Sequence, residues 1–149
     1  MKIITVHKRA RFDYHILETL EAGVVLTGDE VKSLRAGNSN LNDAYATIHD
    51  GNLQIINWYI GPYSHAYAKD DFTRRSRKLL LHRKEINTIA GAISRKGSTI
   101  IPLKVYFSSR GFIKLELGVA QHKNAPDKRE AIKERDIARE TRRDLKNLR

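Results

Sequence analysis

The C-terminal segment constrains this chain most, because it is too polar to contribute to a hydrophobic core. From His122 to Arg149 it contains ten Lys or Arg, six Asp or Glu and no Gly. Helix-forming residues dominate it, but Ile137, Leu145 and Leu148 make an apolar stripe only one residue wide. An isolated helix of this length is marginal in water. We therefore expect a tail that is disordered or transiently helical until an anionic partner orders it.

The whole chain shares this positive charge. It carries 28 Lys or Arg against 17 Asp or Glu, for a net charge of +11. Such a charge speeds association with RNA or DNA. A membrane is excluded as the partner, because no stretch approaches the ~20 apolar residues of a spanning helix. The absence of cysteine excludes disulfides and Cys-based zinc sites, and it fits the reducing cytoplasm in which we place the protein.

Hydrophobic periodicity predicts a domain over residues 1–120 and a tail over residues 121–149. Five or six short strands with helices inserted between hairpins predict a mainly β fold, a small closed or nearly closed antiparallel barrel. In the N-terminal half we expect an irregular segment over 1–13, a strand over 14–26 with a bulge or bend at Gly23, and a helix over 28–36 that begins with a capping box at Thr27-Gly-Asp-Glu30. Strands over 43–49 and 52–60 should follow, joined by an Asp50-Gly51 turn. The remaining expected elements are a loop over 63–76, a helix over 82–95 and a hairpin over 99–120.

Catalytic and metal-binding motifs are missing from the sequence. The six histidines have no metal-ligand spacing, and no phosphate-binding loop or nucleophile motif occurs. Asp70-Asp71 beside Arg74 and Arg75 is the one arrangement that would suit a metal-dependent nuclease. Adjacent carboxylates in a basic loop are more typical of local salt bridges. We therefore predict no catalytic residue, no metal and no cofactor, with a nuclease as the enzyme alternative.

Basic residues form three clusters in the sequence: Lys8, Arg9 and Arg11 near the N-terminus, then Arg74, Arg75, Arg77 and Lys78, and finally the C-terminal tail. Lys32 and Arg35 lie one turn apart, so they share a helix face. With the loop that follows, this face can form a polar ledge or an ordinary solvated surface. His82 is either an RNA contact or a helix N-terminal residue, and Trp58 and Tyr59 are assigned to the core rather than to base stacking. The ledge consists of Glu30, Lys32, Arg35, Asn38 and Asn40.

Several short motifs in one order resemble the SmpB family, the SsrA-binding proteins of bacterial trans-translation. These motifs are Glu30-Val-Lys-Ser-Leu-Arg-Ala-Gly37, Asn40-Leu-Asn-Asp43, Gly61-Pro62-Tyr63, Arg77-Lys-Leu-Leu-Leu-His82, Leu117-Gly-Val-Ala120 and Asp127-Lys-Arg129. The resemblance runs from about residue 7 to the end of the chain. The chain departs from the family pattern at His7, where Asn is frequent, and at Ala125-Pro126, where a His or an aromatic residue often precedes Asp-Lys-Arg.

The resemblance implies an OB-like barrel with three helices that binds the tRNA-like domain of tmRNA. It implies delivery to ribosomes stalled without a codon, together with the translational GTPase that carries aminoacyl-tRNA. The tail would then occupy the empty mRNA channel at the decoding site, against small-subunit rRNA. The expected tmRNA-binding residues are Lys8, Arg9, Glu30, Lys32, Arg35, Asn38, Asn40, Arg77, Lys78 and His82. The expected ribosome-binding residues are Lys123, Asp127, Lys128, Arg129, Lys133, Arg135, Arg142, Arg143, Leu145 and Lys146.

We expect a monomer without enzymatic activity. A structural protein of the small ribosomal subunit would explain the charge and the tail equally well. A sedimentation profile separates the two classes, since a rescue factor is substoichiometric and dissociates.

Overall fold

The computed structural model describes residues 2–63, 72–95 and 97–123. The elements in chain order are β1 (Lys2–Val6), α1 (Ala10–Asp13), β2 (Tyr14–Val24), α2 (Gly28–Arg35), β3 (Ser39–Asn40), β4 (Tyr45–His49), β5 (Asn52–Ile56), β6 (Tyr59–Ile60), the 3-10 turn η1 (Phe72–Arg74), β7 (Arg77–Leu80), α3 (Arg83–Ile93), β8 (Ser98–Phe107) and β9 (Ile113–His122).

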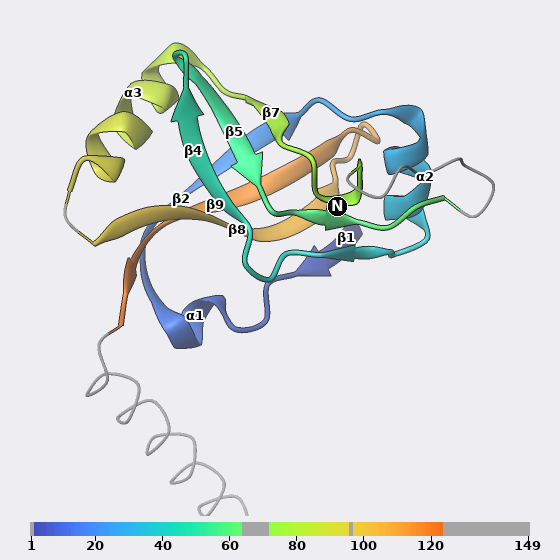
Figure 1. Cartoon of the computed structure of the whole chain (residues 1–149), viewed down its shortest axis with the longest axis horizontal. Helices are drawn as coiled ribbons and strands as arrows, with labels where there is room; N and C mark the ends of the chain where they lie inside the picture. The colour runs from blue at the N-terminus through green and yellow to red at the C-terminus, as the bar shows by residue number, and fades with distance from the viewer. Residues whose placement is uncertain (1, 64–71, 96, 124–149) are drawn as a thin grey trace, which may run out of the picture.

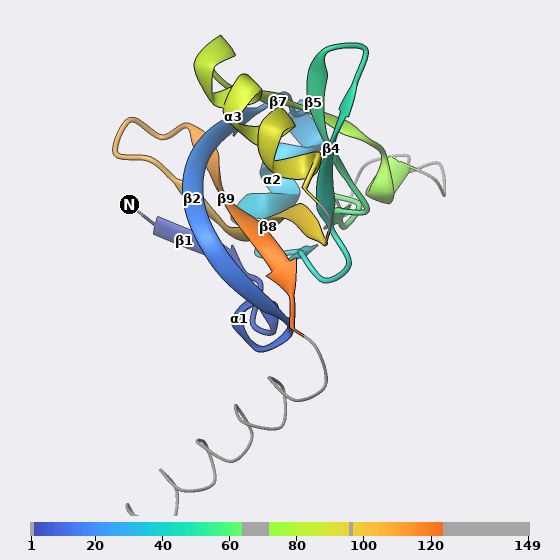
Figure 2. The same cartoon turned by 90° about the vertical axis from the view of Figure 1, so that its left-hand side faces the viewer.

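The strands form a barrel-like ring. Seven strands make one sheet in the order β1-β8-β4-β5-β7-β2-β9, and β9 also pairs with β8. All these pairings are antiparallel. The pairing of β9 with β8, in addition to β2, closes the ring, which leaves few unpaired strand edges. The long strands β2 and β9 curve along one side, with β4 and β5 opposite them (Figure 1, Figure 2). The predicted mainly β, barrel-like fold with inserted helices is confirmed.

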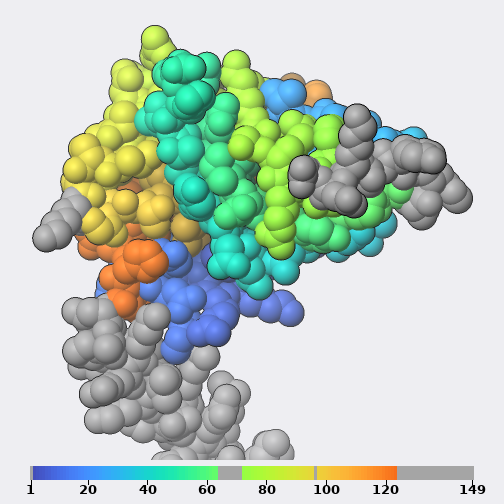
Figure 3. Space-filling model, viewed as in Figure 1, coloured from blue at the N-terminus to red at the C-terminus, as the bar shows by residue number. Residues whose placement is uncertain are grey.

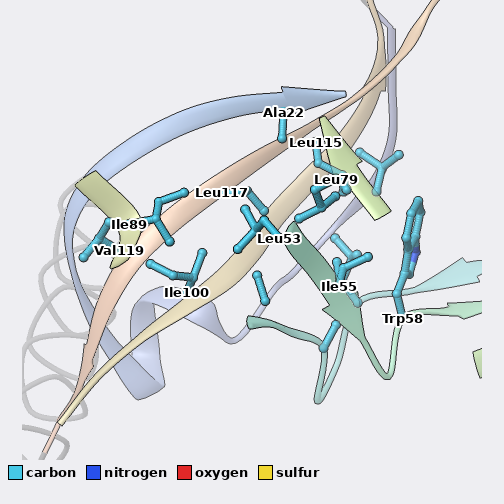
Figure 4. Close-up of a cluster of buried hydrophobic side chains, with 14 of the residues drawn as sticks. Ala22, Leu53, Ile55, Trp58, Leu79, Ile89, Ile100, Leu115, Leu117 and Val119 are labelled. Carbon is cyan, nitrogen blue, oxygen red and sulfur yellow. The ribbon is translucent and has the colours of Figure 1, made fainter. Parts of the chain in front are cut away.

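The hydrophobic core fills the inside of this ring. Alternate residues of several strands point inward, and Leu53, Ile55, Leu115 and Leu117 are fully buried (Figure 4). Helix α3 contributes Ile89 to the same core. Helices α3 and α2 lie at opposite ends of the ring (Figure 1, Figure 2).

Local sequence signals explain two of the connections. Thr27 caps α2, because its hydroxyl accepts a hydrogen bond from the Glu30 backbone N–H (3.3 Å) and the Glu30 carboxylate accepts from the Thr27 N–H (2.9 Å). The β4–β5 turn places Asp50 at φ 50° and Gly51 at φ 76°, as a type I′ hairpin requires. Both predictions are confirmed.

The sequence prediction for residues 1–13 is wrong for most of that segment. Lys2–Val6 form β1, which pairs with β8, and Ala10–Asp13 form α1. The strand predicted over 52–60 is interrupted at Asn57, whose φ of 62° separates β5 from β6. The last described strand continues to His122, where it pairs with Tyr14.

The predicted bulge or bend at Gly23 is also wrong. The register between β2 and β9 shifts between Ile16 and Glu18 instead. Gly23 pairs with Leu80 of β7 and with Lys114 of β9. A Cβ atom on Gly23 would lie 3.3 Å from the Cβ of Leu80, so glycine here permits the close approach of a neighbouring strand.

Some predictions fall outside the described residues. They are Asp70-Asp71 and the tail positions Asp127, Lys128, Arg129, Lys133, Arg135, Arg142, Arg143, Leu145 and Lys146. Lys123 is described, and its backbone N–H donates to the carbonyl oxygen of Asp13 (2.9 Å). Within the described ranges, no helix has the length and apolar content to cross a membrane.

Candidate nucleic-acid interface

A buried ion-pair cluster connects α2 to the segment before β7. The carboxylate of Glu30 accepts hydrogen bonds from the guanidinium groups of both Arg75 and Arg77. Arg77 is fully buried and Glu30 is 5% exposed. We call Glu30, Arg75 and Arg77 the ion-pair cluster. A buried charge is tolerated only when it is paired and hydrogen-bonded, and Glu30 and Arg77 satisfy that condition.

Arg77 has further partners that fix its position. Its guanidinium donates to the carbonyl oxygens of Trp58 (2.6 Å) and Thr73 (3.1 Å). It also lies over the Trp58 ring, 5.3 Å from the ring centroid. Trp58 is fully buried, and its indole N–H donates to the Ser39 hydroxyl (2.8 Å). The assignment of Trp58 to the core is confirmed, whereas Tyr59 is only partly buried.

The ionisation of the ion-pair cluster follows from its contacts. Burial alone would raise the pKa of the Glu30 carboxyl, but hydrogen bonds from Arg75, the Thr27 backbone and Arg77 outweigh burial and hold that pKa below its usual value. Burial lowers the pKa of Arg77, and Glu30 opposes this change. An Arg side chain nevertheless stays protonated in proteins, so the cluster carries two cations against one carboxylate.

The predicted ledge on α2 is therefore only partly a surface. The prediction that Glu30 belongs to it as an exposed residue is wrong, because its carboxylate turns inward to the two arginines. Arg77, also an expected RNA contact, is fully buried because its guanidinium pairs with Glu30. The predicted residues that remain exposed are Lys8, Arg9, Lys32, Arg35, Asn38, Asn40, Lys78 and His82.

Asn38 and Asn40 are exposed, but both also accept hydrogen bonds within the protein. The Gly61 backbone N–H donates to the Asn38 carbonyl (2.9 Å). A Cβ on Gly61 would lie 1.8 Å from the Asn38 side-chain nitrogen, so this position requires glycine while Asn38 keeps its place. The Asn40 side-chain oxygen accepts from the Asn42 backbone N–H (2.8 Å). The loop after α2 is thus held in one conformation.

The fold does not bring the predicted basic residues of α2 together with those near the N-terminus. Lys32 and Arg35 lie on α2, with the Lys32 ammonium 5.1 Å from the Tyr63 ring centroid. Arg9 precedes α1, where it pairs with Asp13 (3.7 Å) and lies over the Phe12 ring (5.2 Å). Helices α1 and α2 occupy different parts of the molecule (Figure 1, Figure 2).

His82 lies beside a groove that the sequence pattern did not indicate. His82 directly precedes α3, and its backbone N–H donates to the Glu85 carboxylate (3.2 Å), so it is a helix N-terminal residue whose side chain is also exposed. The groove has a volume of about 450 Å³ and includes Leu80, which is 51% exposed. The one signal in the sequence is the Leu79-Leu-Leu81 run, in which alternation must turn one leucine outward. The lining residues are Glu21, Gly23, Leu80, Leu81, His82, Glu85 and Lys114.

Among the described residues, no group of three or more His, Asp or Glu side chains is placed to hold a metal ion. The face that includes α2 and the loop after it presents the cations of Lys32 and Arg35 and the amides of Asn38 and Asn40. This combination suits phosphate and sugar contacts with an RNA backbone.

Comparisons with known proteins agree with this description. The family model for the SmpB protein matches residues 4–147. The SsrA-binding protein of Coprothermobacter proteolyticus is 50% identical over 149 residues, covering 98% of each chain. The SsrA-binding protein of Gloeothece citriformis is 51% identical over 147 residues, covering 97% of this chain and 94% of its own.

A solved structure is also similar. It is described as "tmRNA-SmpB: a journey to the center of the bacterial ribosome", and one of its chains superposes with a TM-score of 0.70 at 46% identity, covering 86% of this chain and 93% of the other. Matches of this extent, over nearly the whole length of the relatives, show that this chain belongs to the SmpB family.

Proposed function

We propose that this protein binds the tRNA-like domain of tmRNA and carries it to ribosomes stalled without a codon. The observation that carries the proposal is the family match over residues 4–147, since the relatives are named SsrA-binding proteins. The exposed cations on the barrel support it independently. The proposal includes no catalytic step, and it places the protein in the cytoplasm as a monomer.

Lys32 and Arg35 are the central RNA contacts in this proposal. Both are exposed on α2, whereas Glu30 is buried in the same helix. Affinity would come mainly from phosphate and sugar contacts, because the deep groove of paired RNA offers little sequence to read. Asn38, Asn40, Lys78 and His82 would add hydrogen bonds, and Lys8 and Arg9 would form a second area of contact.

In this proposal Glu30 and Arg77 do not contact the RNA but lie beneath the protein surface that binds it. Their ion pair joins α2 to the start of β7 and orients the backbone that carries Lys32 and Lys78. The side chains that contact RNA are thus presented by a fixed scaffold, which lowers the entropy cost of binding.

The tail would act after RNA binding, on the ribosome. A decoding site without a codon lacks the codon–anticodon duplex, so another group must supply equivalent contacts. The cations of the tail can pair with rRNA phosphates while the segment becomes helical in the empty mRNA channel. A translational GTPase that carries aminoacyl-tRNA would deliver the complex.

Binding of a tRNA-like-domain RNA by gel shift or anisotropy tests the first step. The full-length protein should bind this RNA with an affinity that falls by orders of magnitude between ~50 and ~200 mM salt. A protein truncated after Lys123 should bind the RNA yet fail to support peptide tagging on ribosomes stalled without a codon. Normal tagging by the truncated protein would contradict the role of the tail.

A further inference from the structure

Residues of β6, of η1 and directly after η1 form cation–aromatic pairs that the proposed contact with the tRNA-like domain does not use. The guanidinium carbon of Arg74 lies 5.4 Å from the Tyr59 ring centroid, and that of Arg75 lies 5.4 Å from the Phe72 centroid. Arg77 makes a third pair in the same short stretch of chain. Three of the six cation–aromatic pairs among the described residues therefore involve residues 58–77. We call Tyr59, Phe72, Arg74 and Arg75 the stacking strip.

The two arginines of the stacking strip have hydrogen-bond partners within the protein. Arg75 is bound to Glu30, which is itself bound to the buried Arg77. Arg74 donates to the Asn57 carbonyl oxygen at 3.4 Å. A surface arranged in advance loses less conformational entropy when a ligand binds.

The stacking strip also faces solvent. Phe72 is 49% exposed, Arg74 is exposed, and Tyr59 is partly so. The lime segment that follows residue 71 lies on the face seen in Figure 3. The Arg75 side chain is 27% exposed and its charge is paired with Glu30 below this surface, so the strip presents the Phe72 ring, part of the Tyr59 ring and the Arg74 cation.

We propose that the stacking strip binds unpaired nucleotides of a single-stranded RNA. Exposed aromatic rings stack on bases, and planar guanidinium groups both stack and pair with phosphates. An acidic peptide would satisfy Arg74 but would leave the face of Phe72 without a matching group. The inference rests on the proposed function in taking RNA as the ligand, but it assigns a site apart from Lys32 and Arg35.

The test compares two fluorescent probes of equal length on the full-length protein. One probe is oligoadenylate, and the other has the same phosphates but abasic riboses. Phosphate contacts, including those of any other basic segment, contribute equally to both, so the affinity ratio reports contacts to the bases, and the variants show whether the stacking strip makes them. The wild-type ratio should favour oligoadenylate by about fivefold or more. Phe72→Leu and Arg74→Lys should each reduce this ratio toward one, whereas Arg110→Lys, an exposed arginine in the β8–β9 turn, should leave it unchanged.

Other results would contradict either the stacking-strip proposal or the proposed function. A wild-type ratio of one, or a ratio that persists in both variants while their melting temperatures match wild type, would overturn the proposal. Displacement of oligoadenylate by a polyglutamate peptide whose binding also requires Phe72 would overturn it in favour of an acidic protein partner. Binding of the tRNA-like-domain RNA is measured with the same preparations. If that binding is absent in wild type, the proposed function fails, while the probe ratio still decides the stacking strip.

Discussion

Glu30 and Arg77 lie 47 positions apart in the sequence and form an ion pair in which the Arg77 guanidinium is fully buried. The pair joins the first turn of α2 to the first residue of β7. It therefore supports both the helix that presents Lys32 and the strand that presents Lys78.

Replacement of Glu30 by Gln should destabilise the protein by about 3–5 kcal/mol, because it leaves the buried Arg77 charge without its carboxylate. Chemical denaturation monitored by circular dichroism measures the free energy of unfolding. Asp29→Asn is the matched control, since Asp29 is an exposed acidic residue in the same helical turn. Equal stability of the Glu30→Gln variant and the control would contradict this role.

The same carboxylate predicts a pH dependence of stability. The folded-state pKa of Glu30 is lowered, so its contribution is fully present above the unfolded pKa of about 4.3 and is lost as the pH falls through the lower folded value. The difference in unfolding free energy between wild type and Glu30→Gln should therefore be constant near neutral pH and shrink below about pH 4. Denaturation curves across this range check the prediction, and a difference that does not depend on pH would refute it.

Gly61→Ala should destabilise the protein by about 1–3 kcal/mol, because the new methyl group would overlap the Asn38 side chain. The double variant Asn38→Ala, Gly61→Ala should recover most of this stability, since it removes the atoms that clash. Thermal denaturation of both single variants and the double variant forms a double-mutant cycle. Additive effects of the two substitutions would show that the two side chains do not compete for space.

Lys32→Ala combined with Arg35→Ala should weaken binding to the tRNA-like-domain RNA without lowering the melting temperature, because both side chains are exposed. The slope of log affinity against log salt should fall by about 1 for each RNA phosphate that the variant no longer neutralises. Lys84→Ala with Arg95→Ala is a matched control, as these exposed cations lie in and after α3 at the other end of the ring. An equally weakened control would mean that only total charge matters.

Elements that depend on neighbouring residues could be predicted from the sequence. The capping box at Thr27 and the turn at Asp50-Gly51 need only two to four adjacent residues, and the structure has both. The sequence prediction misses strand β1, although four of its five residues are β-branched, because the segment is short, is followed by basic residues and finds its strand partner only in the distant β8. The role of Gly23 could not be predicted for the same reason, since it depends on Leu80 and Lys114, both distant in the sequence.

In the candidate site too, local properties could be predicted from the sequence, whereas properties that depend on distant residues could not. Exposure of Lys32 and Arg35 follows from their shared helix face, which is a local property. Burial of Arg77 does not, because a charged residue is expected at the surface unless its partner is known. That partner, Glu30, is identified only when the ring closes and α2 packs beside β6 and β7. The groove beside His82 likewise exists only where β2, β7 and the start of α3 meet.

The central claim is that this protein binds tmRNA, and capture of the RNA bound to it in cells tests the claim most directly. Tagged full-length protein is isolated under gentle conditions, and the associated RNA is sequenced beside that from the Lys32→Ala, Arg35→Ala variant. The account predicts that tmRNA is the most enriched RNA with the wild-type protein and that this enrichment falls with the variant. Recovery of ribosomal RNA in stoichiometric amount without enrichment of tmRNA would contradict the account and indicate a structural ribosomal protein.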